Sequence, residues 1–311
     1  MQIDLEQAVH ALKEGGVIAV PTETVYGLAA SMHSHGAIGK IFDLKGRPLS
    51  NPLIIHCATS DQIVEFVSEL PPQFNELAHA FWPGPMTLVL PIRSRLVPSI
   101  VRAHLETAGF RIPRHSMARE LLQLTGPLVM PSANLSGRPS STSRKHVEED
   151  FGTQFPVLDG GLCEKGLEST ILGRNDGKWV IYRLGALSAG DFESVLGYCP
   201  SVINEMPSEK PLCPGQLFRH YSPKARLILG DSTFIEEATC ILGFSERKYP
   251  EGKQVLILGS LNDPEEVAGN LYSQLRMLDE KEVAVAWVDT YFPREGLWIT
   301  IAERLERAAS K

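Results

Sequence analysis

The alternation of short apolar runs with longer amphipathic segments limits the fold of this chain more than any other feature. The run 17–20 is continuous, apolar and rich in β-branched residues, which predicts a buried strand. Similar runs recur at 53–56, 86–90, 109–112, 128–130, 169–172 and 179–183. Amphipathic segments typical of helices lie between several of them, at 37–44, 73–81, 116–124 and 143–151. This alternation predicts an α/β domain with a sizeable sheet.

The N-terminal residues add two local expectations. Asp4 can cap a helix that runs to about Glu14, where two glycines end it. Pro21 ends the first predicted strand, and the segment 22–24 can open a short helix.

The character of the sequence changes between residues 197 and 223. Prolines interrupt this stretch and no periodicity is present, which predicts a linker or a long ordered loop. Strands at 226–229, 254–258 and 283–288 then alternate with helices from 264 and at 295–308. We therefore predict a domain at 1–200, a linker at 201–225, and a small three-layer Rossmann-like α/β domain at 226–311.

Composition narrows the class of protein. The net charge of −7 argues against a non-specific nucleic-acid binder, which usually carries a surplus of basic residues. The N-terminus lacks the features of a secretory signal, and no apolar run approaches the roughly 20 residues that cross a bilayer. The five cysteines are scattered without a CxxC pair, which favours buried thiols over metal ligands or disulfides. We expect a cytoplasmic protein with no membrane partner.

Two cations near a flexible turn are the first candidates for chemistry. Lys45 and Arg47 flank Gly46 at the end of a predicted helix, and such a pair suits phosphate or carboxylate. Taken alone, a solvated basic helix end is the more common explanation. Asn51 then leads into a strand that ends at His56, on the edge where ligands bind in α/β sheets, although a lone histidine there is more often structural.

A hydroxyl-rich loop is the second candidate. Ser132 and Asn134 follow a predicted strand, and Ser140 and Thr142 follow them just before a helix, so exposed N–H groups and small donors can bind an anion. Ordinary capping by Thr142 or Ser143 explains the same residues, and both explanations can hold. Arg111, Ser169 and Arg183 lie at strand ends, where each is about as often structural as functional.

Several kinds of site lack support. The chain has no GxSxG elbow, no HExxH, no clustered Cys/His set, and no GxGxxG or GxxxxGK[ST] loop. We therefore expect no metal site built from protein side chains, and Mg²⁺ would arrive with a nucleotide.

Taken together, the segments resemble one family. The motifs Pro21-Thr-Glu-Thr-Val-Tyr-Gly27, Lys45-Gly-Arg-Pro48 and Asn51-Pro-Leu53 occur in the family's order, followed by Phe81-x-Pro-Gly-Pro-x-Thr87, Arg111-x-Pro-x-His115, Pro131-Ser-Ala-Asn134, Ser136-Gly137 and Glu168-Ser-Thr170. They resemble the YrdC-like L-threonylcarbamoyladenylate synthases. The segment 214–223 and the small domain after it resemble the long two-domain form, although Gln216 stands where we expect methionine.

The resemblance implies a twisted mixed sheet with a concave cavity and a defined reaction. L-threonine, bicarbonate and ATP give threonylcarbamoyl-AMP and pyrophosphate, and the intermediate passes to a separate transferase complex for t⁶A modification of tRNA at position 37. Direct tRNA binding is expected to be weak or absent. Because a carbamate oxygen attacks the α-phosphorus and pyrophosphate leaves, catalysis requires positioning and electrostatic stabilisation, without a protein nucleophile.

The resemblance also implies roles for individual residues. Lys45 and Arg47 are assigned to the phosphate and carbamate charge. The predicted threonine site consists of Thr24, His56, Arg111, Ser132 and Ser169. The predicted nucleotide site consists of Arg47, Asn51, Thr107, Ser132, Asn134, Ser140, Thr142, Arg183 and Tyr221, the last as part of a lid that excludes water.

Two alternatives remain at this point. An RNA-binding protein could use the same concave face, although the acidic balance counts against it. A carbamoyl-adenylate enzyme of the hydrogenase-maturation type is disfavoured, because the chain has no acylphosphatase-like or zinc-binding modules.

Overall fold

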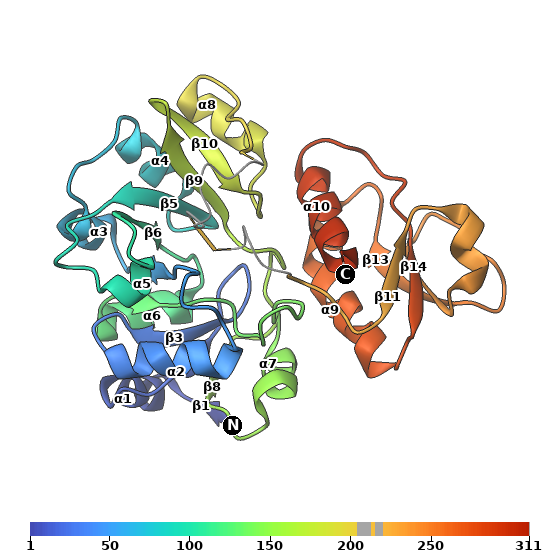
Figure 1. The fold of residues 1–311 in the computed structure, drawn as a ribbon, viewed down its shortest axis with the longest axis horizontal. Coiled ribbons are helices and arrows are strands. Elements are labelled where there is room, and N and C mark those ends of the chain that lie inside the picture. Colours follow the sequence, from blue (N-terminus) through green and yellow to red (C-terminus); the bar gives the residue numbers. More distant parts are fainter. Residues whose placement is uncertain (204–212, 215–219, 311) are drawn as a thin grey trace.

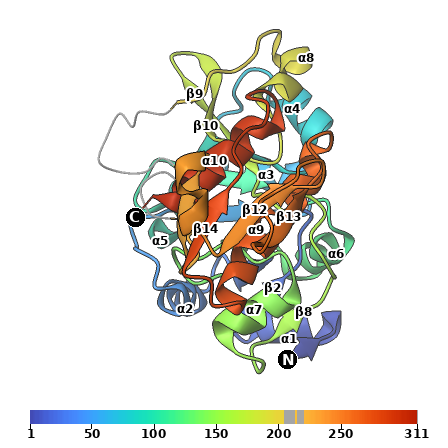
Figure 2. The same ribbon diagram turned by 90° about the vertical axis from the view of Figure 1, so that its right-hand side faces the viewer.

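The computed structural model describes residues 1–203, 213–214 and 220–310. These residues form two bodies that lie side by side (Figure 1), and the second covers the first when viewed from its own side (Figure 2). Gln216 lies outside the described residues, and so does most of the predicted lid.

The first body contains a mixed ten-stranded sheet in the order β1-β8-β2-β3-β7-β4-β6-β5-β9-β10. Its strands are β1 (Gln2–Ile3), β2 (Ile18–Val20), β3 (Gly27–Ser31), β4 (Ile54–His56), β5 (Met86–Pro91), β6 (Thr107–Arg111), β7 (Leu128–Val129), β8 (Val157–Leu158), β9 (Thr170–Asn175) and β10 (Lys178–Arg183). Its helices are α1 (Leu5–Lys13), α2 (His35–Lys45), α3 (Ser60–Phe66), α4 (Phe74–Phe81), α5 (Ser99–Arg102), α6 (Ser116–Thr125), α7 (Arg144–Phe151), the 3₁₀ turn η1 (Ala189–Phe192) and α8 (Glu193–Leu196).

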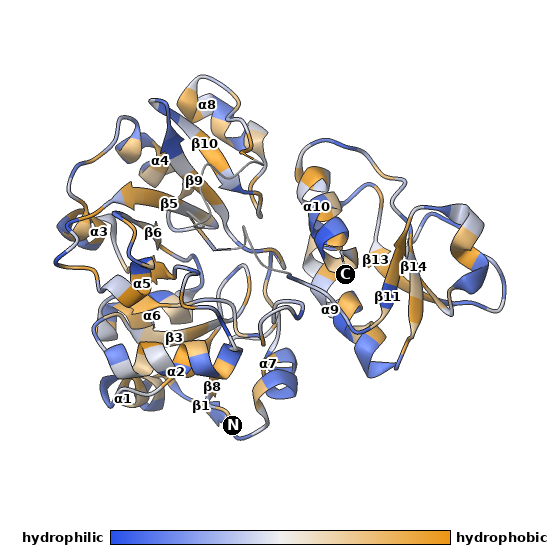
Figure 3. Cartoon of the chain, viewed as in Figure 1, coloured by the Kyte–Doolittle hydropathy of each residue, from blue (hydrophilic) through white to orange (hydrophobic). Residues whose placement is uncertain are grey.

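Helices cover both faces of this sheet. Because side chains alternate along a strand, Ile18 and Val20 pack in one cluster with α1 and α6, while Ala19 packs in another with α2, α3 and α4. Figure 3 shows apolar residues concentrated on the central strands. Every apolar run predicted as a strand lies within or overlaps an observed strand, so the α/β prediction is confirmed.

Two local expectations were incomplete or wrong. The segment 22–24 opens no helix; instead the Thr22 hydroxyl accepts from the Val25 backbone N–H at 3.2 Å and donates to its carbonyl at 2.7 Å. This tight turn leads into β3. That strand consists mainly of small residues and has no β-branched residue, so its sequence does not indicate a strand. The four-residue helix α5 and the two-residue strands β1 and β8 were too short to leave a pattern.

The second body is a parallel four-stranded sheet in the order β11-β14-β12-β13. Its elements are β11 (Arg226–Leu229), η2 (Ser232–Glu237), β12 (Cys240–Phe244), β13 (Gln254–Gly259), α9 (Pro264–Glu280), β14 (Val285–Val288) and α10 (Leu297–Ala309). Both α9 and α10 lie on the face toward the first body (Figure 1). The 3₁₀ helix η2 and Tyr249 cover the other face, which completes three layers. The sequence prediction missed β12.

Four cysteines, Cys57, Cys163, Cys213 and Cys240, are buried as expected, while Cys199 is exposed. No helix of the described residues combines the length and the apolar character that crossing a bilayer requires.

Candidate functional site

The sheet of the first body brings several strand ends to one edge. β4 pairs in parallel with β6, and the register sets His56 opposite Arg111. β5 runs antiparallel to β6 and parallel to β9, and β10 returns antiparallel to β9. The ends of β4, β6 and β10 therefore meet the start of β9, where Ser169 precedes Thr170. Polar residues from distant parts of the chain converge there because the strand order places them together.

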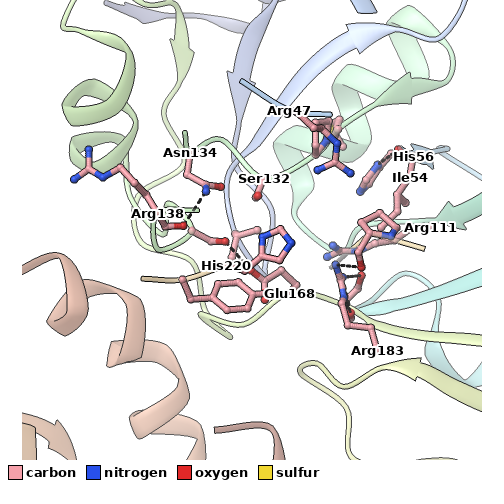
Figure 4. Close-up of a pocket in the computed structure, with 17 residues that line it drawn as sticks. Arg47, Ile54, His56, Arg111, Ser132, Asn134, Arg138, Glu168, Arg183 and His220 are labelled. Atoms are coloured by element: carbon pink, nitrogen blue, oxygen red, sulfur yellow. Dashed lines mark hydrogen bonds between the residues drawn. The ribbon is translucent and has the colours of Figure 1, made fainter. Parts of the chain in front are cut away.

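A cavity that opens to solvent lies at this edge, with about 630 Å³ of empty space when the open part is included. Nine of the predicted site residues line it: Arg47, His56, Arg111, Ser132, Asn134, Ser140, Ser169, Arg183 and Tyr221. In Figure 4, Arg47, His56, Arg111 and Arg183 lie on one side, and Asn134, Arg138 and Glu168 lie on the other.

Arg47 and Arg183 share the cavity, and neither forms a salt bridge with a carboxylate in the described part of the chain. Arg47 donates to the carbonyls of Asn51 at 3.2 Å and Pro52 at 2.7 Å. Arg183 donates to the carbonyl and hydroxyl of Ser169 at 2.8 and 3.1 Å. Burial and the charge of Arg183 lower the pKa of Arg47 to about 9. Two positive charges that lie close together in a cavity repel each other, so an anion that binds between them is stabilised.

Lys45 lies elsewhere than expected. It is the last residue of α2 and not a loop residue, since the chain turns only at Gly46, which has a left-handed φ of 61°. Its buried ammonium donates to the carbonyls of Ser132 at 2.5 Å and Asn134 at 2.6 Å, and it does not line the cavity. Burial and the charge of Arg47 lower its pKa well below the usual value. Lys45 therefore holds the 132–134 loop from behind.

The end of the cavity near β4 and β6 is close to neutral. Arg111 pairs with the buried carboxylate of Glu23 at 2.7 Å and donates to the carbonyl of Gly84 at 3.3 Å. Burial and the charge of Arg111 lower the pKa of His56 well below its usual value, so its imidazole is uncharged at neutral pH. Neutral hydrogen-bonding groups beside a compensated cation can bind a zwitterion without leaving a net charge buried.

The hydroxyl-rich loop forms the opposite wall. Asn134 donates to the carbonyls of Leu135 and Arg138, while its side-chain oxygen is buried without a partner among the described residues. Ser140 donates to the carboxylate of Glu168 at 2.6 Å. This buried acceptor in the cavity wall is available to a hydrogen-bond donor of a ligand or of water.

The other four predicted site residues do not line the cavity. Thr24 is buried against the Thr22 hydroxyl at 2.8 Å, and the buried side-chain oxygen of Asn51 has no partner in the described ranges. Thr107 begins β6, at the opposite end of the strand from Arg111, and lines a separate hollow. Thr142 contacts Ser273 of α9 at 3.2 Å, and the cap of α7 is Ser143, one of the two alternatives that the sequence left open.

Sequence reasoning assigned no role to several residues that matter here. Glu168, Arg138 and His220 line the cavity, and Glu23 neutralises Arg111. Both glutamates stand inside motifs that carried the family resemblance. The sequence did contain a signal for both glutamates, since each is a charged residue within a buried segment. A buried charge requires a partner, so such a residue indicates an ion pair or a site.

Acid should destabilise the protein through these two glutamates. Burial opposes their ionisation, but Arg111 lowers the pKa of Glu23, and Arg304 with Arg183 lowers that of Glu168 to about 2. A carboxylate whose pKa is lower in the folded than in the unfolded state stabilises the fold above the unfolded-state pKa, and this stabilisation is lost as the pH falls. Glu168 alone should therefore contribute about 3 kcal/mol to the free energy of unfolding, and this contribution should disappear between pH 5 and pH 2. Denaturant titrations across this range measure it. Glu168→Gln should flatten the dependence, and an unchanged slope would contradict this origin.

No group of three or more His, Cys, Asp or Glu side chains suited to a metal ion occurs among the residues that the structure describes. The carboxylate in the cavity, Glu168, is already engaged by Ser140, Tyr272 and Arg304. The donor set of the cavity therefore suits anions and hydrogen-bonding groups better than a bare cation.

Comparisons with known proteins place nearly the whole chain in one family. Residues 10–185 match the Sua5/YciO/YrdC family model, described as "Telomere recombination", and residues 187–310 match one described as "Threonylcarbamoyl-AMP synthase, C-terminal domain". Curated relatives named threonylcarbamoyl-AMP synthase, from Pyrococcus abyssi and Bacillus subtilis, are 37% and 36% identical over 97% and 98% of this chain and 93% and 92% of their own lengths. The crystal structure of P. abyssi Sua5 complexed with L-threonine superimposes with a TM-score of 0.92 at 34% identity, covering 99% of this chain and 97% of that one.

Proposed function

The chain belongs to the Sua5/YciO/YrdC family in its two-domain form, and from this premise we propose how its cavity makes threonylcarbamoyl-AMP. The enzyme is a threonylcarbamoyl-AMP synthase, which converts L-threonine, bicarbonate and ATP into threonylcarbamoyl-AMP and pyrophosphate for t⁶A modification of tRNA. The observation that carries the proposal is the pair Arg47 and Arg183, which face one cavity without a carboxylate partner among the described residues.

Threonine binds at the near-neutral end. A zwitterionic amino acid carries no net charge, which suits a wall made of neutral His56, the Ser169 hydroxyl and an Arg111 already paired with Glu23. Thr24 lies behind this wall and supports it through Thr22.

The nucleotide binds along the opposite wall, with its phosphates toward the two arginines. Asn134 offers an unpaired acceptor, and Ser132, Ser140 and Tyr221 complete the surface. The carbamate oxygen and the α-phosphate must approach although both are negatively charged. Arg47 and Arg183 offset this repulsion and stabilise the charge that develops as pyrophosphate leaves. Lys45, Asn51 and Thr142 act from outside the cavity, and Thr107 has no part in it.

The linker contributes a cover. Tyr221 and His220 line the cavity although they follow the first domain by some 20 residues along the chain, which supports a lid within 201–225. We place the catalytic domain at 1–200 and the small domain at 226–311, as the sequence predicted. Excluding water protects an intermediate that hydrolyses readily.

Mg²⁺ would be carried by the phosphates of ATP, since the carboxylate of the cavity is occupied by protein partners. Transfer of the product to a separate complex, little direct tRNA contact and a cytoplasmic location remain predictions from the sequence. The RNA-binding alternative gains nothing from this cavity, whose cations are half-buried or buried.

Pyrophosphate release tests the proposal. The full-length protein is incubated with ATP, bicarbonate and Mg²⁺, with and without L-threonine, and pyrophosphate is followed by a coupled assay. We expect release that depends on threonine and a nucleotide product whose mass is that of threonylcarbamoyl-AMP. If pyrophosphate is released at the same rate without L-threonine, or is not released under either condition, the proposed function is refuted.

A further inference from the structure

Two side chains of the C-terminal domain reach the back of the cavity. Tyr272 on α9 and Arg304 on α10 are buried, although they lie more than 100 residues along the chain from their partner Glu168. Neither lines the cavity. The buried positive charge of Arg304 requires polar or charged partners, and those partners indicate what the side chain does.

Arg304 forms ion pairs with two carboxylates, its neighbour Glu303 and the cavity residue Glu168. The partner that leads to the cavity is Glu168. Its one carboxylate oxygen accepts from Tyr272 at 2.8 Å and from Arg304 at 3.3 Å, while its other oxygen accepts from Ser140 at 2.6 Å. Arg304 also donates to the Tyr272 hydroxyl at 3.1 Å. Glu168 and Ser140 both line the cavity, so a hydrogen-bonded chain runs from α10 to the cavity wall.

A further partner is Tyr221, which lines the cavity from the linker. Its ring stacks on that of Tyr272, with centroids 5.1 Å apart and planes 17° apart, and the Arg304 guanidinium lies 4.9 Å from its centre. Tyr221 has a φ of 68°, a left-handed conformation that a bulky residue adopts only when its surroundings enforce it. Stacking and the cation–π contact are interactions of the strength needed to hold it.

A separate contact steadies the same loop from its outer side. Arg276 on α9 is buried and donates to the carbonyl of Pro139 at 2.7 Å and to Asp150 at 2.9 Å. The loop that carries Ser140 is therefore held by both helices of the C-terminal domain.

We propose that Arg304 and Tyr272 are positioning residues for the synthase reaction, which orient Ser140 through Glu168 and hold Tyr221 over the cavity. The proposal rests on the proposed function, and it gives the C-terminal domain a role in the reaction, because its helices complete the nucleotide side of a site built on the other domain. A site placed by such contacts is sensitive to shifts of about 1 Å.

The test compares variants of the full-length protein that change one side chain each. Arg304→Met keeps length and loses charge, and we expect kcat/KM to fall on the order of 100-fold. Tyr272→Phe keeps the stacked ring and loses the hydroxyl, which donates to Glu168 and accepts from Arg304, so a loss of about tenfold is expected. Arg304→Lys should restore part of the activity, because it returns the charge without the planar fork.

Thr300→Val is the matched control. Thr300 lies one turn before Arg304 on α10, is buried, and donates across the same domain boundary to the carbonyl of Gly185 at 3.1 Å, yet it does not line the cavity. Its kcat/KM should stay within about twofold of wild type. If Thr300→Val and Tyr272→Phe lose activity equally, the contacts are merely structural and the proposal fails.

Binding measurements separate this inference from the proposed function. Calorimetry should show weaker binding of a non-hydrolysable ATP analogue to Arg304→Met, while L-threonine binds within about twofold of wild type, because His56 and Arg111 are untouched. A double-mutant cycle of Arg304→Met with Glu168→Gln should be strongly non-additive; additive losses would overturn the proposed chain. If Arg304→Met fails to fold, Tyr272→Phe decides. An inactive wild type would instead refute the synthase function itself.

Discussion

Replacing Arg47 with alanine is expected to lower kcat/KM for threonylcarbamoyl-AMP formation on the order of 10²–10³-fold, the usual loss when one donor to a developing charge is removed. Arg47 faces the cavity, and its pKa of about 9 reflects burial and the nearby charge of Arg183. Removing it relieves that repulsion and costs two hydrogen bonds to carbonyls at the edge of the cavity. Stability should therefore change little, by about 1 kcal/mol or less.

Lys45→Met is the informative comparison. The sequence led us to expect that Lys45 and Arg47 would each affect activity far more than stability, but the structure separates them. Lys45 is buried on α2 and satisfies two carbonyls, which its loss would leave unpaired. We expect a cost of about 2–4 kcal/mol in unfolding free energy as well as lower activity. Thermal melts beside the pyrophosphate assay measure both. If Lys45→Met and Arg47→Ala lower the unfolding free energy equally, the two residues do not differ in their structural role.

Ending the chain after Ile203 is expected to reduce turnover to on the order of 1% of the full-length value, because it removes Tyr221 and both helices that hold Glu168. The first domain should remain folded. Its two large apolar clusters consist only of residues before 203. Ile203 is retained because its N–H donates to the carbonyl of Ile181 in β10 at 3.0 Å.

Circular dichroism and a cooperative thermal transition check the fold of the fragment, and the pyrophosphate assay checks its turnover. Part of the surface around Val25 and Leu167, which packs against the second domain, becomes exposed, so the fragment should melt at a lower temperature. A folded fragment with full activity would eliminate any role of the tail in turnover. A fragment without cooperative melting would show that the domains fold as one unit.

Helices and strands with a periodic apolar pattern could be predicted from the sequence. Elements built of small residues, or too short to show a pattern, could not. The run 17–20 and the helix from Pro264 are cases in which local burial and capping chemistry agree with the final fold. β3 contains glycine, alanine and serine, so its place in the sheet comes from pairing with β2 and β7 and not from its own propensity.

The site divides along a similar line. The sequence identified residue types that suit an anion, and nine of the residues chosen by motif resemblance line one cavity. It misplaced Lys45 and Thr107, since the direction of a side chain at a helix end, or the end of a strand at which a residue lies, depends on register and not on composition. Glu168 and Arg304 stand 136 residues apart, and no local pattern links them.

The sequence by itself therefore determined the alternation of strands and helices, the two-domain division and the chemistry that the motifs can supply, because propensity, capping and side-chain type are local properties. Only the tertiary structure decided which residues face the cavity, which cations are already neutralised and how the second domain reaches the first. Strand order, register and domain packing bring distant residues together, and the energy of a buried charge depends on those neighbours.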